Sequence, residues 1–327
     1  MRTADPLKMR LPEPGGRRRT QKLLFKNQLG LHCMVWPGIL FMLIFVYVPL
    51  AGYILAFQDY QISSSIFNCP WVGFKHFQDL LRDGDFFLAL RNTFALGGLK
   101  FSVGFTLPIL FALIINEMPL LRLKKATQTG SYLPHFLSYV VVATIWMVFL
   151  DPKGLINDLL LKIGLLKQPI MFLAEPKLFW GIGTMIEAWK ETGWNAIIYL
   201  AAIAGVDQEL YEAALVDGAG RLKRIIHITL PAITGTMVVL FIFNFGNMLN
   251  GGQTGSTASN FDQSYLLGNP FNHETSFVLQ YYILNTGLKL FRYSYSTAAS
   301  LLLAITSLAM MLFANWGAKK VTGRNVL

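Results

Sequence analysis

Charged side chains and cysteines are both scarce in this sequence. Only 14% of its 327 residues are Asp, Glu, Lys or Arg, whereas soluble domains carry about 25%. The two cysteines, Cys33 and Cys69, fall near opposite ends of one apolar run. They are too far apart to pair, so no disulfide framework is expected. The low charge excludes an ordinary soluble globular protein.

Motifs for nucleotide, metal and acyl chemistry are also missing. The sequence has no G-x-x-x-x-G-K-[ST] segment, so we expect no ATP bound through a P-loop. Its histidines show neither H-E-x-x-H spacing nor a cluster with cysteine, which predicts no metal site. No Ser–His–Asp arrangement can be argued either. We therefore expect no catalytic residue and no cofactor in this chain.

Long apolar runs fill most of the sequence. A membrane-spanning helix needs about 20 mostly apolar residues, and six runs qualify: 33–57, 89–116, 128–150, 178–205, 231–250 and 296–316. The fourth run contains Glu187, Lys190 and Glu191. The first run is too long for the apolar part of a cleaved signal peptide. The sequence predicts an all-α integral membrane protein whose six-span domain covers 31–320.

Basic residues predict the orientation of these spans. Residues 1–30 carry eight Lys and Arg residues against Asp5 and Glu13. The connection 117–127 and the tail 321–327 are basic as well. Short flanks rich in Lys and Arg stay in the cytoplasm, so both termini should be cytoplasmic and the long loop 251–295 should lie outside. We interpret the basic N-terminus as this signal and expect no nucleic-acid partner; membrane lipid is the surrounding medium.

A polar segment, 207–230, interrupts the apolar runs on the predicted cytoplasmic side. Ala213 and Ala214 favour a helix, Gly218 can end it, and Pro231 is placed to open the next helix. Tied to the membrane at both ends, a short surface helix offers a second protein a place to bind.

The run Glu212-Ala213-Ala214-x-x-x-Gly218, followed by Ile228-Thr229-Leu230-Pro231, resembles the EAA loop of ABC importer permeases, in its sugar-importer (maltose-permease-like) version. The resemblance implies a type I permease fold with a cytoplasmic coupling helix in a bacterial inner membrane. It implies partners: a second homologous permease, two copies of a cytoplasmic ATPase that bind ATP and Mg, and an extracytoplasmic solute-binding protein. The residues it implies for coupling are Glu212, Ala213, Ala214, Asp217, Gly218 and Arg221.

Polar groups at membrane depth are candidates for contact with a solute. Glu187, Lys190 and Glu191 share one helical face, which predicts either an internal pair that joins helices or the lining of a polar path. Both readings stay open. Asn244, Asn247 and Asn250 form a slowly rotating polar stripe whose amides suit sugar hydroxyls.

His135, Ser138 and Tyr139 follow Pro134, which can kink the third span. Leu133-Pro134, Trp189 and Phe243-Asn244-Phe245 resemble landmarks of maltose-type permeases. That resemblance implies solute contacts at His135, Tyr139, Lys190, Glu191 and Asn247, although this sequence has a Lys and a Glu where those permeases have apolar or small residues.

Segments of the last third resemble permeases that import polysaccharide fragments, a branch that includes the alginate importer. These segments are Asn247-Met248-Leu249-Asn250, Tyr265-Leu266-Leu267-Gly268-Asn269-Pro270 and Tyr293-Ser294-Tyr295-Ser296-Thr297-Ala298-Ala299. An ammonium group at Lys190 would then attract a uronate carboxylate. We expect a permease subunit of an ATP-driven importer for oligo- or polysaccharide, acidic in this hypothesis. A secondary transporter or channel for a polar solute, and a membrane-embedded enzyme, are the alternatives.

Overall fold

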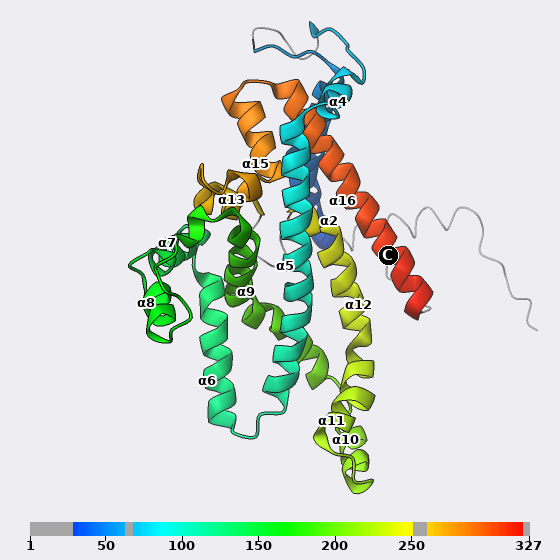
Figure 1. The fold of residues 1–327 in the computed structure, drawn as a ribbon. Coiled ribbons are helices and arrows are strands. Elements are labelled where there is room, and N and C mark those ends of the chain that lie inside the picture. Colours follow the sequence, from blue (N-terminus) through cyan, green and yellow to red (C-terminus); the bar gives the residue numbers. More distant parts are fainter. Residues whose placement is uncertain (1–28, 63–67, 251–259, 323–327) are drawn as a thin grey trace, which may run out of the picture. The chain divides into compact units, whose positions relative to one another are not determined.

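A computed structural model describes residues 29–62, 68–250 and 260–322 of the chain (Figure 1). The predicted tails, 1–30 and 321–327, and the loop composition at 251–257 therefore fall largely outside the described residues. The chain divides into two compact units, residues 1–54 and 55–327. Within the described part, the single extended pairing is a bridge between Gln58 and Trp71, and helices make up most of the rest.

The described part of the first unit, residues 29–54, is one apolar helical run interrupted near its end. Its elements are α2 (Leu29–Met42), the π-turn η1 (Leu43–Tyr47), α3 (Val48–Leu50) and the beginning of η2 (Ala51–Phe57). The π-turn comes just before Pro49. Proline has no N–H to donate to the residue four before it, and a wider turn accommodates that missing bond.

The second unit holds the other helices. In chain order they are α4 (Lys75–Leu80), α5 (Gly84–Asn116), α6 (Leu121–Tyr132), η4 (Leu133–Phe136), α7 (Tyr139–Leu150), α8 (Leu155–Lys162), η5 (Phe172–Ala174), η6 (Pro176–Leu178), α9 (Phe179–Ala204), α10 (Gln208–Val216), α11 (Arg221–Arg224), η7 (Ile225–Thr229), α12 (Leu230–Gly246), η8 (Met248–Asn250), α13 (Asn260–Leu267), α14 (His273–Ser276), α15 (Leu279–Leu284), η9 (Asn285–Lys289) and α16 (Tyr293–Thr322).

Five segments of the described chain are long and apolar enough to cross a membrane. They are Cys33–Phe57, Gly84–Asn116, Tyr139–Lys162, Arg221–Gly246 and Tyr293–Lys320. The third of them is α7 followed by α8, with a turn between the two helices. Helix α9, the fourth predicted span, has 26 residues but is absent from this set. Helix α9 is long enough to cross a membrane, but its three charged residues, Glu187, Lys190 and Glu191, make it less apolar than the other five segments.

The region of the third predicted span, 128–150, is not one helix. Residues 121–132 already form α6, so Arg122, Lys124 and Lys125 lie in a helix and not in a connection. The helix then tightens into η4 at Pro134, becomes extended at Leu137 and Ser138, and restarts as α7. Proline removes a helical donor, and the Ser138 hydroxyl accepts from the Val141 N–H at the new start.

Two further sequence expectations differ from the structure. Helical backbone does not begin at Pro231: it runs from Arg221 through the π-turn η7 into α12. The missing proline N–H is again accommodated by a wider turn. The segment 251–295, expected as a long loop, contains α13, α14, α15 and η9 in its described part.

Helices α5 and α9 form the most extensive pairing of the second unit. Buried apolar side chains pack in three clusters. One joins α5 to α15 and α16, one joins α5 and α9 to α7 and α13, and one joins α5 and α9 to α12. Helices α10 and α11 lie at one end of this unit, whereas α4 and α15 lie toward the other (Figure 1). The α9 charges therefore face the interior of a bundle.

Candidate functional site

The break between α6 and α7 lies against the middle of α9. A broken helix leaves backbone carbonyl groups without helical donors. The ammonium group of Lys190 donates to two of these carbonyl oxygens, at 2.6 Å to His135 and 3.4 Å to Pro134. Lys190 is 0% exposed. The Pro134 carbonyl also accepts from the Leu137 N–H at 3.2 Å, so the lysine's shorter bond, to His135, is the one that joins α9 to the break.

Glu191 connects the same two elements from the neighbouring position. Its Oε1 lies 3.2 Å from the Lys190 Nζ, and its Oε2 lies 2.7 Å from the His135 Nδ1. The His135 ring also stacks on Trp194, with 4.2 Å between ring centroids. The sequence placed His135, Lys190 and Glu191 on one path, and the structure brings these three together. Of the two readings left open, the geometry favours the internal connection between helices.

A second buried ion pair lies on α9, and sequence reasoning found only half of it. Glu187 Oε2 is 3.8 Å from the Nζ of Lys100, which comes from α5. Both side chains are buried, at 2% and 3% exposure. Lys100 stands inside the predicted span 89–116, and a lone charge at membrane depth was a signal that could have singled it out. Tyr139, also on the predicted path, is buried at the start of α7.

The three asparagines of the predicted polar stripe are not brought onto one face. Asn244 is buried in α12, whereas Asn247 is exposed at the end of that helix. The Oδ1 of Asn250, in η8, accepts from Gln280 Nε2 at 3.2 Å. The chain leaves the α-helical path after Gly246, so the helical periodicity used in the prediction no longer applies.

The predicted coupling segment folds as a capped helix followed by a sharp turn. The Asp207 carboxylate accepts from the Glu209 N–H and opens α10. At the other end the Ala219 N–H donates to the Ala214 carbonyl and the Gly218 N–H to the Leu215 carbonyl. This is the Schellman pattern. It requires the positive φ of +74° that Gly218 adopts.

This segment is held in place while its outer face is left open. The hydroxyls of Tyr211 and Thr229 lie 2.9 Å apart and join α10 to η7. The predicted coupling residues Glu212, Ala213, Asp217, Gly218 and Arg221 are exposed, and Ala214 is half-buried. Val216 is 89% exposed. A rigid, exposed and partly apolar helix is the kind of surface that another protein covers.

Comparison with known proteins identifies the family. Residues 101–323 match the model of the binding-protein-dependent transport system inner membrane component. The chain is 42% identical over 305 residues to the polygalacturonan/rhamnogalacturonan transport system permease protein YteP of Bacillus subtilis, covering 92% of each chain. It is 40% identical over 296 residues to Protein LplB of the same organism, covering 90% of each.

Solved structures give the same assignment. The fold matches a chain of a bacterial ABC transporter involved in the import of the acidic polysaccharide alginate, with a TM-score of 0.83 and 39% identity. The match covers 93% of this chain and 99% of that one. A second structure, of an alginate ABC transporter in complex with an alginate pentasaccharide-bound periplasmic protein, has a TM-score of 0.82. The resemblance stated from the EAA segment is thereby confirmed, and this chain belongs to the family of inner membrane permease components of binding-protein-dependent ABC transporters.

Proposed function

We propose that this chain is one of two permease subunits of an ATP-driven importer for saccharides, and that α9 is one of its six membrane spans. Family membership supports the first part. For the second, Glu187, Lys190 and Glu191 are each at most 2% exposed and are paired inside the protein. Charges that face the bundle interior and are paired lower the cost of placing α9 in a bilayer.

The orientation that we propose puts α10 and α11 in the cytoplasm. The connection between α5 and α6 lies toward the same end of the second unit as these helices (Figure 1). Arg122, Lys124 and Arg221 belong to the elements gathered there. Basic flanks stay inside, and six spans return the chain to its starting side. Both termini are then cytoplasmic, in a bacterial inner membrane.

The exposed, capped helix α10 is the observation that carries the coupling proposal. It meets a cytoplasmic ATPase through Glu212, Ala213, Ala214, Asp217, Gly218 and Arg221. Because the sequence has no P-loop, ATP and Mg are bound by that partner, present in two copies, and this chain is not an enzyme. The turn at Gly218 passes motion of α10 to α11 and α12, since all three belong to one hydrogen-bonded segment.

The proposed substrate is an acidic oligosaccharide, delivered by a solute-binding protein. Two similar proteins support this: one is named a polygalacturonan/rhamnogalacturonan permease, and the other belongs to an importer of the acidic polysaccharide alginate. The solved alginate transporter bound to a periplasmic protein supports the delivery step. A second, homologous permease completes the pathway. In this chain we place Tyr139, Asn244 and Asn247 along the solute pathway. The charged and polar side chains of the α9 cluster fix the position of the α6–α7 break; they are His135, Glu187, Lys190 and Glu191.

Co-purification and ATPase assays test this function. The chain is expressed with its transporter partners, and the yield of associated ATPase is measured for wild type, Glu212→Ala and the control Glu175→Ala. We expect Glu212→Ala to reduce association or coupled ATPase activity, since this side chain lies on the open face of α10, and the control to leave both unchanged. ATPase stimulation is then compared across neutral and acidic saccharides. Solute flux that persists without any ATPase partner would support the secondary transporter instead.

A further inference from the structure

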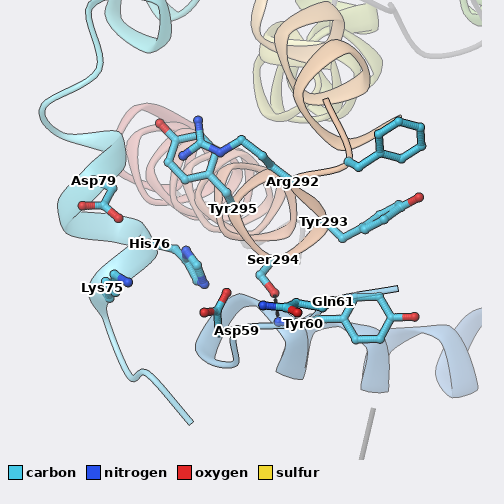
Figure 2. A pocket seen from close by; sticks show the side chains of 11 residues that line it. Asp59, Tyr60, Gln61, Lys75, His76, Asp79, Arg292, Tyr293, Ser294 and Tyr295 are labelled. Carbon is cyan, nitrogen blue, oxygen red and sulfur yellow. Dashed lines mark hydrogen bonds between the residues drawn. The ribbon is translucent and has the colours of Figure 1, made fainter. Parts of the chain in front are cut away.

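A polar pocket of about 320 Å³ lies in the second unit. None of its lining residues belongs to the cluster of Lys100, His135, Glu187, Lys190 and Glu191. Three segments line it: residues 59–61, helix α4 and residues 291–295 at the start of α16 (Figure 2). Figure 2 shows Asp59, Gln61 and Ser294 close together, with His76 facing them from α4. Pockets of about 300 Å³ or more are the usual size for small-molecule sites.

The walls of this pocket are fixed by hydrogen bonds within the chain. The Tyr60 N–H donates to the Ser294 hydroxyl at 3.0 Å. His76, which is buried, donates from Nε2 to the Gln58 carbonyl at 3.1 Å. The Asp59 N–H donates to the Pro70 carbonyl at 2.9 Å. The segments are held in register, so the pocket is preformed.

Tyr295 is anchored on both sides. Its hydroxyl donates to the Asp83 carboxylate at 2.8 Å, and the Tyr282 hydroxyl donates to the same oxygen at 2.7 Å. The Arg292 guanidinium lies over the Tyr295 ring, 3.9 Å from its centroid. The stacking holds the guanidinium in one place while Arg292 itself stays exposed. A charged donor is therefore presented at the pocket in a defined position.

Phe291, at the edge of the pocket, has a backbone conformation that bulky residues rarely adopt. Its φ is +57°, which in the described chain no other non-glycine residue matches. Phe291 is the second residue after the end of η9, as Gly218 is the second residue after the end of α10. The N–H of the next residue, Arg292, donates back to the Thr286 carbonyl of η9. Glycine is preferred there, and a bulky residue carries strain. Phe291 is 62% exposed, so packing does not compensate.

Aromatic rings continue from Phe291 along the pocket. The centroids of Phe291 and Tyr293 are 6.4 Å apart, and those of Tyr293 and Tyr60 are 5.9 Å apart. Planar polar groups stand beside them, on Asp59, Gln61 and Arg292. Aromatic faces suit the C–H faces of a pyranose ring. Carboxylate, amide and guanidinium groups together accept from and donate to its hydroxyls.

The charges that line the pocket balance one another. Lys75 and Arg292 supply two positive charges, and Asp59 and Asp79 supply two negative charges. The site therefore does not require a ligand of either sign, and hydroxyl groups satisfy it. Strain tolerated at an exposed aromatic residue beside such a pocket indicates a function for that ring.

We infer that this pocket is a saccharide subsite that binds one pyranose unit of an oligosaccharide between the aromatic row and the polar groups of Asp59, Gln61 and Arg292. The inference rests on the proposed function, because it takes the substrate class from it. It adds a second point of contact for a long chain, separate from the predicted pathway residues.

The test uses the complete transporter in nanodiscs without its binding protein. Titration calorimetry measures binding of trigalacturonate and of maltotriose to wild type, Phe291→Gly and Tyr293→Ala. We expect at least one of these two sugars to bind the wild-type transporter, and we expect the same sugar to bind each variant about tenfold more weakly. The matched control is Phe271→Ala, since Phe271 is 73% exposed and lies outside the pocket. Phe291→Gly should melt at the same or a higher temperature, because glycine relieves the positive φ.

Three outcomes overturn the inference. Wild-type affinity for both sugars in the variants would show that the aromatic row does not bind saccharide. Absence of binding to wild type, in a complex that still imports sugar with its binding protein, would reject the subsite and leave the importer standing. Weaker association of the binding protein with unchanged saccharide affinity would make the pocket a protein contact. A wild-type complex that neither binds an ATPase nor imports sugar would instead reject the proposed function.

Discussion

The ammonium group of Lys190 lies 2.6 Å from the carbonyl oxygen of His135. This bond joins the centre of α9 to the place where the chain stops being helical between α6 and α7. Buried carbonyl groups without a donor are costly, so the break at Pro134 and the lysine depend on each other. Lys190, for which the sequence left an internal pair and a solute path both open, makes the contacts of an internal pair.

Replacing Lys190 with Met should destabilise the bundle strongly. The change leaves Glu191 and two carbonyl groups without the ammonium, and breaking a buried pair on one side costs about 3–5 kcal/mol. We expect a lower thermal midpoint and less folded protein in size-exclusion profiles. Lys162→Met is the control, because the Lys162 side chain is 70% exposed and pairs with Asp158 at the surface. Equal melting of the two variants would contradict the structural role.

Asp83 should make stability depend on pH in the acidic range. Burial, the largest influence, raises the pKa of its carboxyl, but hydrogen bonds from Tyr282, Tyr295 and two backbone N–H groups outweigh it, and the pKa falls below the ordinary 3.8. Burial also raises the pKa of the Tyr282 hydroxyl, which stays protonated as a donor. A lowered folded pKa adds stability above the unfolded pKa, and that stability disappears as pH falls through the folded value.

Wild type should therefore melt higher than Asp83→Asn at pH 7, with the gap closing below about pH 4. Thermal unfolding of both proteins from pH 7 down to about pH 3 measures this. Asp158→Asn removes an exposed carboxylate and controls for the loss of one charge. A gap that stays constant down to the lowest pH would show that the Asp83 charge is not what the tyrosines stabilise.

Gly193 should tolerate no side chain. A Cβ at this position of α9 would lie 2.3 Å from the carbonyl oxygen of Ser131 in α6, and backbone cannot move aside cheaply. We expect Gly193→Ala to cost about 1–3 kcal/mol or more. Gly181→Ala is matched, since it lies in the same helix and its Cβ meets nothing within 4 Å. Thermal midpoints compare the pair, and a Gly193→Ala protein as stable as Gly181→Ala would mean that α6 and α9 are farther apart.

Gly218→Ala should weaken coupling through the backbone alone. A Cβ there has open space around it, but φ is +74°, and the left-handed conformation costs an alanine about 1–2 kcal/mol. We expect lower ATPase stimulation by saccharide, with the chain still assembled. Gly235→Ala in α12 has equal space and no positive φ, and should behave as wild type. Full stimulation in Gly218→Ala would separate the turn from coupling.

The family and the helical class could be predicted from local signals. Low charge, long apolar runs and the EAA segment need only neighbouring residues to be read, and α10 with its turn at Gly218 forms from such local bonds. The residues at which several helices begin and end could not be predicted as well. Pro134 indicated a kink, but the sequence did not predict that helix α6 begins at Leu121 and includes the basic residues 122, 124 and 125.

The polar network shows the same limit. Three charges on one face of α9 indicated a functional cluster, and sequence alone left two readings of it. Distances to His135, Pro134 and Lys100 favour one of them, and those partners lie 55 to 87 positions away along the chain. The polar pocket joins segments that are still farther apart in the sequence, since it brings residues near 60 to residues near 293.

What the sequence determined by itself is therefore the membrane class, the family segment and the local turn chemistry, because hydropathy, propensity and glycine conformation act over a few residues. Only the tertiary structure decided which charge neutralises which, where the third helix breaks and that an aromatic row borders a polar pocket. Pairing and burial depend on where distant segments meet, and in a helical bundle that is set by side-chain packing between helices.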